Sequence, residues 1–257
     1  MNIHVCIKQV PDLNAPIRIA EGELARDMDR MVLNAYDASA LEEALVLAEA
    51  HGGEVEVVLI GSEKASDVIR KALAMGASKG THIVTDLDAD FDSSSYAAIL
   101  AAWFRELNIE YIFTGKQSQD TDAGLTGGML AAHLGIPWAS NAVAIESDGD
   151  NLTVTRQGDS GREVLELPAP GLVTCSNDMN EPRIPNLKGI MQSKKKPVDQ
   201  IPLTELFPDT DKLAGRTRIL SYEEKPARKA GEKLEGEPGE LAVRVARLLA
   251  EKENLIG

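Results

Sequence analysis

The chain has 257 residues, of which 43% are hydrophobic and only 4% aromatic, so aliphatic side chains must fill most of its core. This length allows one large domain, or one domain with a long appendage. Lys and Arg number 27 against 41 Asp and Glu, and the formal charge of −14 disfavours binding to nucleic acid or to an anionic membrane. Two cysteines exclude a disulfide scaffold, and the absence of Cys-x-x-Cys or paired histidines disfavours a metal site.

The cellular location is inferred from what the sequence lacks. No apolar run approaches the roughly 20 residues that a membrane-spanning helix needs. The chain enters a strand-like run at its start, so we expect no signal peptide. Cys6 and Cys175 both lie in apolar runs rather than in a disulfide pattern. We therefore expect a cytoplasmic protein without direct membrane insertion.

The first 140 residues alternate between strand and helix patterns. Apolar runs predict strands at residues 3–10, 54–60, 81–85 and 111–114, and helical spacing predicts helices over residues 40–48, 65–75, 97–107 and 129–134. The predicted N-caps are Asp37 or Ser39 for the first helix and Ser62 for the second, and Asp92 together with residues 93–95 is expected to open the third. Repeated β-α units predict an α/β fold with a parallel, doubly wound, Rossmann-like sheet and helices on both faces.

The pattern changes after about residue 140. Strand-like runs at residues 142–146, 152–156, 163–167 and 171–174 are separated by turn sequences, which predicts a small antiparallel extension of the sheet. Residues 208–238 are rich in charge, Gly and Pro and are too poor in apolar residues to fold alone. An amphipathic helix over residues 241–249 still needs a surface to bury against. We therefore expect an α/β domain over residues 1–207 and a C-terminal arm over residues 208–257 that packs on another subunit.

The segment 115–127 is the most informative part of the sequence. It joins the strand at 111–114 to the helix at 129–134 and is small, polar and interrupted by glycine. Such a turn is where α/β proteins hold phosphate and ribose, because the first N–H groups of the helix point at the ligand. Asp120 and Asp122 are able either to accept from ribose hydroxyls or to hold the loop's own N–H groups. Two carboxylates alone are weak evidence for a metal, and we expect none.

Five segments in register resemble the β subunit of electron transfer flavoprotein. They are residues 5–12, 34–37, 70–77, 115–127 and 180–196, and together they extend over most of the chain. The resemblance implies an α/β heterodimer in which the α subunit holds most of a redox-active FAD and the β subunit buries a structural AMP. It carries over to the nucleotide site Cys6, Asn34, Ala35, Tyr36, Asp37, Ile60, Lys116, Gln117, Ser118, Gln119, Asp120, Thr121, Asp122, Ala123, Gly124, Leu125, Thr126 and Gly127.

The sequence also departs from this family pattern. Ala35 stands where the family usually has Pro, and Leu125 stands where many members have Gln. An electron-bifurcating branch of the family binds a second FAD in place of AMP, and residues 8–12 resemble the start of that branch. The loop at 120–126 does not match that branch well, so we expect AMP and keep a second FAD as the alternative.

The segment 180–196 resembles the loop with which the family docks partner dehydrogenases. Its apolar residues Ile184, Leu187, Ile190 and Met191 lie in a Pro-rich stretch, and Leu187 matches the family's anchoring leucine. A solvated surface loop with a Lys run is the simpler alternative. Tyr36 is expected either to pack as a half-buried aromatic or to contact the flavin of the α subunit.

These observations favour an electron-carrier subunit without bond chemistry of its own. By resemblance, the dimer takes electrons from flavin dehydrogenases of the acyl-CoA type and passes them towards a quinone reductase. An adenine-nucleotide hydrolase or ligase is a rival, but such enzymes carry a Ser-Gly-Gly-x-Asp-type loop after strand one, which this chain lacks. A nucleotide sensor resembling universal stress proteins is a second rival, and it does not explain the arm or the Leu187 segment.

Overall fold

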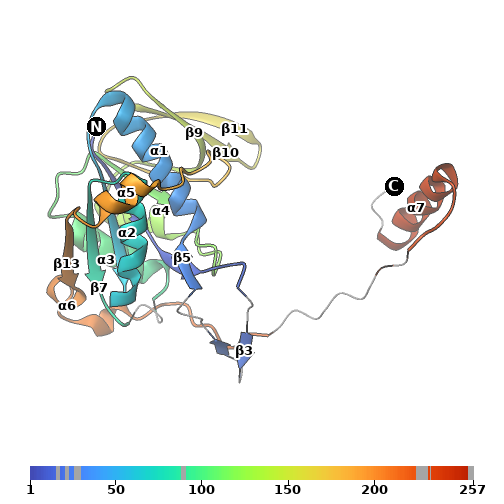
Figure 1. The fold of residues 1–257 in the computed structure, drawn as a ribbon, viewed down its shortest axis with the longest axis horizontal. Coiled ribbons are helices and arrows are strands. Elements are labelled where there is room, and N and C mark those ends of the chain that lie inside the picture. Colours follow the sequence, from blue (N-terminus) through green and yellow to red (C-terminus); the bar gives the residue numbers. More distant parts are fainter. Residues whose placement is uncertain are drawn as a thin grey trace. The chain divides into compact units, whose positions relative to one another are not determined.

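The alternation of apolar strands and helices builds a nine-stranded sheet with helices on both faces, which confirms the predicted α/β fold class (Figure 1). The computed structural model describes residues 1–15, 18–20, 23–25, 30–87, 91–223, 231 and 233–253. The strand order is β11-β10-β9-β12-β8-β1-β6-β7-β13. In this spatial order, every strand from β9 through β12, β8, β1, β6 and β7 to β13 runs parallel to its neighbour. At the other end of the sheet, β10 is antiparallel to β9, and β11 is antiparallel to β10.

The elements and their bounds follow in chain order. The strands are β1 (Ile3–Ile7), β2 (Gln9–Pro11), β3 (Arg18–Ala20), β4 (Glu23–Ala25), β5 (Met31–Leu33), β6 (Val55–Gly61), β7 (Lys79–Val84), β8 (Tyr111–Gly115), β9 (Trp138–Ser147), β10 (Leu152–Gly158), β11 (Gly161–Leu167), β12 (Gly171–Cys175) and β13 (Val198–Pro202). The helices are α1 (Ala35–His51), η2 (Glu63–Ala65), α2 (Ser66–Met75), α3 (Ser93–Phe104), α4 (Thr126–Leu134), α5 (Leu187–Ser193), α6 (Leu203–Leu206), η4 (Thr210–Leu213) and α7 (Pro238–Glu253).

The direction in which the sheet grows reverses between β1 and β8. From β1 the sheet extends through β6 to β7, and β8 then pairs on the opposite side of β1. The helix after β1, α1, packs on one face of the sheet, while the helix after β8, α4, packs on the other. Open α/β sheets bind ligands at such a switch point, in the crevice outside the carboxyl ends of the strands.

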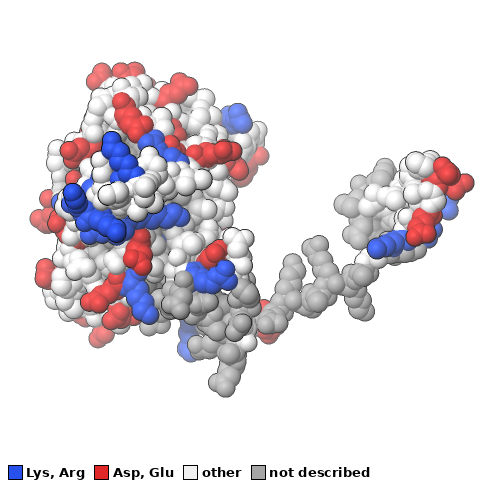
Figure 2. All heavy atoms as spheres, in the orientation of Figure 1, with Lys and Arg blue, Asp and Glu red and all other residues white. Residues whose placement is uncertain are grey.

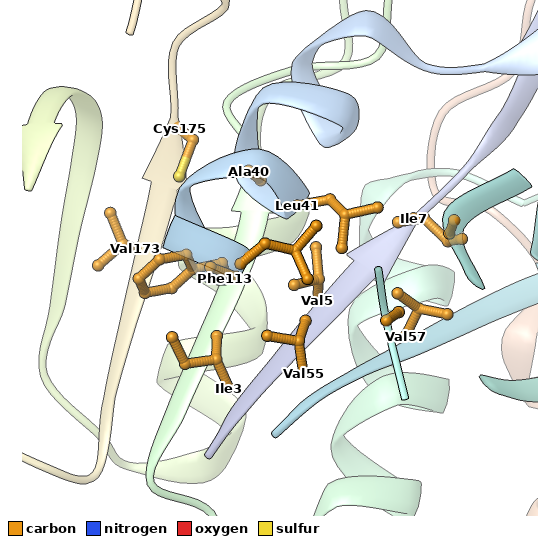
Figure 3. Close-up of a cluster of buried hydrophobic side chains, with 14 of the residues drawn as sticks. Ile3, Val5, Ile7, Ala40, Leu41, Val55, Val57, Phe113, Val173 and Cys175 are labelled. Carbon is orange, nitrogen blue, oxygen red and sulfur yellow. The ribbon is translucent and has the colours of Figure 1, made fainter. Parts of the chain in front are cut away.

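The core lies in two layers, one on each face of the sheet. Figure 3 shows part of the first layer, a cluster of buried side chains that includes Leu41 of α1, Val5 on β1, Phe113 on β8 and Val173 on β12. Leu41 and Phe113 have no exposed surface, and burying a side chain of this size stabilises the fold by about 1.5–3 kcal/mol. The second layer packs α3 and α4 on the other face, so both sheet faces are covered as parallel strands require.

The first strand is shorter than its apolar run predicts. Residues 3–10 were expected to form one strand, but β1 ends at Ile7 and β2 pairs with β5 in a separate two-stranded sheet. The N–H of Lys8 donates to the side chain of Asp37 at 2.8 Å instead of joining the ladder. The chain therefore leaves the large sheet at Lys8.

The helix starts were predicted with mixed success. Asp92 caps α3 as expected, accepting from the N–H groups of Ser94 at 2.9 Å and Ser95 at 3.2 Å. The first helix begins earlier than predicted, with Asn34 at its N-cap, so Asp37 and Ser39 lie inside the helix. Ser62 precedes the short helix η2, and the prediction that its side chain caps the helix is wrong.

The strand β12 does not belong to the antiparallel extension in which residues 171–174 were placed. β9, β10 and β11 form the expected meander, with turns at residues 148–150 and 158–161. β12 instead lies between β9 and β8 and runs parallel to both. All five of its residues are buried, which is typical of a central strand covered on two faces.

The chain divides into two compact units, one over Met1–Ser221 and one over Tyr222–Gly257. Residues up to Ser221 belong to the sheet unit, where Leu213 is buried and the N–H groups of Arg216 and Thr217 donate to Asp92 at 2.7 and 2.9 Å. The unit from Tyr222 to Gly257 contains α7, on which Val243 and Val245 are exposed. Within the described ranges, no helix is both long and apolar enough to cross a membrane.

Candidate functional site

Four segments that are distant in sequence meet at the carboxyl ends of β1 and β8. They are Lys8, residues 34–37 at the start of α1, the loop 116–125, and the start of α4. The switch point of the sheet thus brings most of the predicted nucleotide-site residues together. We describe each contact in turn.

Asp37 joins the ends of the two strands. Its carboxylate accepts from the N–H of Lys8 at 2.8 Å and from the N–H of Gly115 at 2.9 Å. A side chain at position 115 would collide with Asp37, so this close approach requires glycine there. Burial raises the pKa of Asp37 to about 7, although the hydrogen bonds to its carboxylate act in the opposite direction.

Asn34 fixes the loop to the start of α1. Its side-chain amide donates to the carbonyl of Gln117 at 3.0 Å, and its Oδ1 accepts from the N–H of Gln119 at 3.1 Å. The side chain of Gln119 returns the contact by accepting from the N–H of Ala35 at 3.2 Å. The side chain of Asn34 is buried, so these hydrogen bonds are sheltered from competing water.

Lys8 supplies a cation that the sequence analysis did not single out. Its ammonium group donates to both carboxylate oxygens of Asp120, at 3.1 and 3.0 Å, and to Ser118 Oγ at 3.0 Å. Burial by itself would raise the pKa of Asp120, but the charge of Lys8 and the hydrogen bonds from Ser118 and Lys8 act together in the opposite direction, and the pKa lies below its ordinary value. The sequence predicted one strand over residues 3–10, so Lys8 was placed inside a strand and its position at the switch point became visible only in the structure.

The loop also closes on itself. The N–H of Ser118 donates to the carbonyl of Ala123 at 3.0 Å, and the N–H of Asp122 donates to the carbonyl of Ser118 at 2.8 Å. Asp122 has a φ of 53°, and its carboxylate accepts from the side chain of Gln117 at 2.9 Å. Thr121 contacts Asp120 through its hydroxyl at 3.4 Å. The two aspartates therefore hold the loop in shape, whatever ligand the site takes.

The start of α4 is left open towards the crevice. Leu125 occupies the N-cap position and is 64% exposed, and among the described residues no side chain caps the helix. A Cβ on Gly127 would lie 2.5 Å from Thr174 Cγ2 and 3.1 Å from Thr114 Oγ1, so the first turn rests directly on β12 and β8. A Cβ on Gly124 would lie 3.2 Å from the carbonyl oxygen of Lys116. Thr126 begins the helix, whose first N–H groups have the geometry that binds oxyanions.

The remaining predicted residues differ in their burial and in their contacts. Cys6 and Ile60 are buried in the core layer beneath α3 and α4, and burial raises the pKa of the Cys6 thiol, which disfavours a nucleophilic role. The Lys116 ammonium lies 5.9 Å from the centre of the Tyr36 ring. The N–H of Lys116 donates to the carbonyl of Cys175 at 2.8 Å, which fixes the start of the loop to β12.

The four predicted docking residues all lie on the surface of the sheet unit. Their exposed fractions are 91% for Ile184, 75% for Leu187, 45% for Ile190 and 64% for Met191. The segment is not only a loop, because residues 187–193 form the short helix α5, capped by the side chain of Asn186. The three apolar residues of α5 were interpreted as part of a loop because Pro and Gly mask the helical pattern, whereas the Lys run at residues 194–196 follows the helix and is not part of it.

Comparison with known proteins finds similarity to one protein family. The model of the electron transfer flavoprotein domain family matches residues 22–206. The chain is 32% identical to the electron transfer flavoprotein subunit beta of Bacillus subtilis, over 100% of both chains. It is 34% identical to the subunit of that name from Syntrophomonas wolfei, over 96% of this chain and 94% of the relative. For the Bradyrhizobium diazoefficiens subunit the identity is 36%, over 100% and 99%.

Proposed function

Since this chain belongs to the electron transfer flavoprotein family, among its β subunits, we propose that it forms one half of a heterodimeric electron carrier. The chain would pair with an α subunit and contribute no bond chemistry of its own. The single observation that carries the proposal is the open N-terminus of α4 at the switch point of the sheet, fixed by Lys8, Asn34 and Asp37.

The residues of the crevice fit a purine mononucleotide, and we propose AMP. The first N–H groups of α4, from Thr126 onwards, suit a phosphate, and Gly127 lets the helix approach closely enough. Cys6 and Ile60 supply an apolar layer at the ends of β1 and β6 suited to an adenine ring. The carboxylate of Asp120 is already paired with the ammonium group of Lys8, so its negative charge would not repel the phosphate. The AMP would be structural and would take no part in electron transfer.

We further propose that the chain completes the FAD site of the α subunit. The FAD supplies the electron-transfer chemistry when it is bound. Tyr36 lies at the start of α1 beside Lys116, half-buried at the rim of the crevice, where an aromatic ring is available to a partner's flavin. In this proposal Tyr36 contacts and orients the flavin, and Lys116 provides a nearby positive charge.

The exposed apolar residues of the segment 180–196 are proposed to dock partner flavin dehydrogenases of the acyl-CoA dehydrogenase type. Leu187 would enter an apolar pocket of the partner, with Ile184, Ile190 and Met191 around it. Electrons received by the dimer would then pass towards a quinone reductase. This role explains why four large apolar side chains remain in contact with water.

The released nucleotides test the proposal directly. The chain is co-expressed with its α subunit, the purified complex is denatured, and the nucleotides in the supernatant are separated by chromatography. We expect one FAD and one AMP for each dimer. Two FAD molecules would instead support a bifurcating flavoprotein, and a colourless homo-oligomer that hydrolyses ATP would reject the electron-carrier function.

A further inference from the structure

The segment 180–196 presents exposed apolar side chains on a backbone that is tied down at both ends. Figure 2 shows Lys and Arg atoms gathered on the face where α5 lies in Figure 1. Most surface loops with this composition would sample many conformations, and a partner would have to order them at a cost in affinity. The contacts of this segment with α1 and α2 indicate that the segment is already ordered in the folded chain, so that a partner does not have to order it.

The first tie joins the segment to α1 through Arg183. Its guanidinium donates to Glu42 at 2.9–3.1 Å and to Glu49 at 2.5 and 3.2 Å, and its backbone N–H also donates to Glu42 at 2.9 Å. The hydrogen bonds to Glu49 and Glu42 raise the pKa of Arg183 further above its ordinary value. Nearby, the Asn180 side chain donates to the carbonyl of Ser39 at 3.1 Å. This end of the segment therefore follows one face of α1.

The second tie is a reciprocal pair of helix caps between α2 and the end of the segment. Arg70 of α2 donates from Nη1 to the carbonyls of Ser193 at 2.7 Å and Lys196 at 2.9 Å, where α5 ends. Lys196 returns the contact, because its ammonium donates to the carbonyls of Leu73 at 2.9 Å and Ala77 at 2.6 Å at the end of α2. Carbonyls at helix ends lack partners within their own helix, so each cation satisfies groups that the other helix leaves open.

Between the two ties, α5 rests directly on the backbone of α2. A Cβ on Gly189 would lie 2.5 Å from the carbonyl oxygen of Ala74, so only glycine allows this approach. The side chain of Asn186 accepts from the N–H of Gly189 at 2.8 Å and fixes the start of α5. The side chains of Leu187 and Met191 remain exposed.

We propose that Arg70, Lys196 and Arg183 are positioning residues that hold α5 in its docking conformation before a partner arrives. This inference rests on the proposed docking role of the segment. Arg70 and Lys196 fix its end and Arg183 fixes its beginning, while Leu187 makes the contact with the partner. Loss of the Arg183 tie frees the segment from α1, and loss of the Arg70–Lys196 tie frees α5 from α2. Either loss lowers the affinity for the partner without changing the electron-transfer step.

The test uses the complete heterodimer with Arg70→Met, and Lys71→Met as the matched control, because Lys71 is an exposed cation next to Arg70 on α2. The first measurement needs no partner. Hydrogen exchange of the amides 187–193 and trypsin cleavage after Lys188 are both expected to accelerate about tenfold in Arg70→Met and to stay unchanged in Lys71→Met, because fixed helices resist exchange and proteolysis. Unchanged exchange and cleavage in Arg70→Met would overturn the proposal.

The second measurement uses a partner dehydrogenase and separates KM from kcat. Arg70→Met is expected to raise the KM for the partner about tenfold with kcat unchanged, and Arg70→Lys to restore part of the loss because it keeps one cation near the two carbonyls. Faster exchange with an unchanged KM would also overturn the proposal. A Leu187→Ala variant run in parallel tests docking itself, so failure of the proposed function is distinguishable from failure of this inference.

Discussion

The ammonium group of Lys8 lies 3.0 Å from the carboxylate of Asp120 and thereby joins the end of β1 to the loop that follows β8. Their side chains are only 28% and 16% exposed, so water screens this ion pair less than it screens a pair on the open surface. The pair spans the two strands between which the sheet reverses its growth. It therefore links the two strand ends between which we propose that the nucleotide binds.

We predict that Lys8→Met weakens AMP binding by about tenfold, equivalent to about 1.4 kcal/mol. The substitution keeps the length of the side chain but leaves the half-buried Asp120 without its cation, which loosens the loop and adds a negative charge near the phosphate. AMP affinity is measured by calorimetry on nucleotide-depleted complex, with Lys64→Met as a control because Lys64 is exposed.

A double variant distinguishes loss of the pair from loss of a positive charge. Adding Asp120→Asn to Lys8→Met removes the unpaired carboxylate, so part of the affinity is expected to return and the two substitutions are expected to be non-additive. Equal AMP affinity in Lys8→Met and in the unmodified complex would show that this ion pair does not shape the site.

Asp37 gives the stability of the chain a distinctive dependence on pH. Burial raises its pKa in the folded state from the ordinary 3.8 to about 7, so between these values the folded state binds more protons than the unfolded state. The free energy of unfolding that depends on this group is therefore greatest below about pH 4, falls as the pH rises through this window, and is constant above about pH 7. We predict that Asp37→Asn removes this decline.

Asp37→Asn also has a cost at every pH. One of the two carboxylate oxygens is replaced by an amide N–H, which faces the donor of either Lys8 or Gly115. A buried donor left without an acceptor costs about 1–3 kcal/mol. Urea unfolding of both proteins from pH 4 to pH 8 measures the difference. A parallel pH dependence in the two proteins would show that Asp37 titrates normally.

The elements of the sheet were largely predictable because their signals are local. The apolar run of β8, the helical spacing of α2 and the cap at Asp92 each depend on neighbours in sequence. The position of β12 could not be predicted in this way, because its pairing with β8 and β9 joins residues far apart in the chain. The end of β1 at Ile7 depends in the same way on Asp37, which withdraws the N–H of Lys8 from the ladder.

In the candidate site, too, the residues with a local sequence signal were predicted and those that depend on distant contacts were not. The loop 116–125 was recognised from its composition and from its place between a strand and a helix. The role of Lys8 depends on a contact with Asp120 across the crevice, and the roles of Arg70 and Lys196 depend on two helix ends that meet only in the fold. A lone Lys or Arg in a sequence of this charge carries no local signal for such contacts.

The approach of α4 to the sheet leads to a prediction at Gly127. We predict that Gly127→Ala lowers the free energy of unfolding by about 1–3 kcal/mol, because the new methyl group overlaps Thr174 Cγ2 and pushes the first turn of α4 outwards. The same shift moves the first N–H groups of the helix, so AMP content per purified dimer is expected to fall as well.

A second substitution provides a matched rescue for Gly127→Ala. Thr174→Ser removes the overlapping methyl group but keeps the Oγ that accepts from the N–H of Asn141 at 2.9 Å. The double variant is expected to recover both stability and AMP content. A double variant as unstable as Gly127→Ala alone would contradict this steric explanation.

The exposed position of Leu187 separates docking from folding. We predict that Leu187→Ala lowers kcat/KM for electron transfer from a partner dehydrogenase at least tenfold, equivalent to about 1.4 kcal/mol or more, because it removes the apolar anchor of the proposed interface. The side chain is 75% exposed, so the midpoint of thermal unfolding and the content of AMP and FAD are expected to stay unchanged.

Leu107→Ala is the control for this variant, since Leu107 is also exposed and lies after α3 rather than in the docking segment. It is expected to leave electron transfer unaffected. Stopped-flow reduction of the dimer's flavin by the dehydrogenase, at several concentrations of the partner, separates binding from the electron-transfer step. Identical kinetics in Leu187→Ala and the unmodified dimer would move the docking surface away from α5, because an anchor in a closed interface cannot be truncated without loss of affinity.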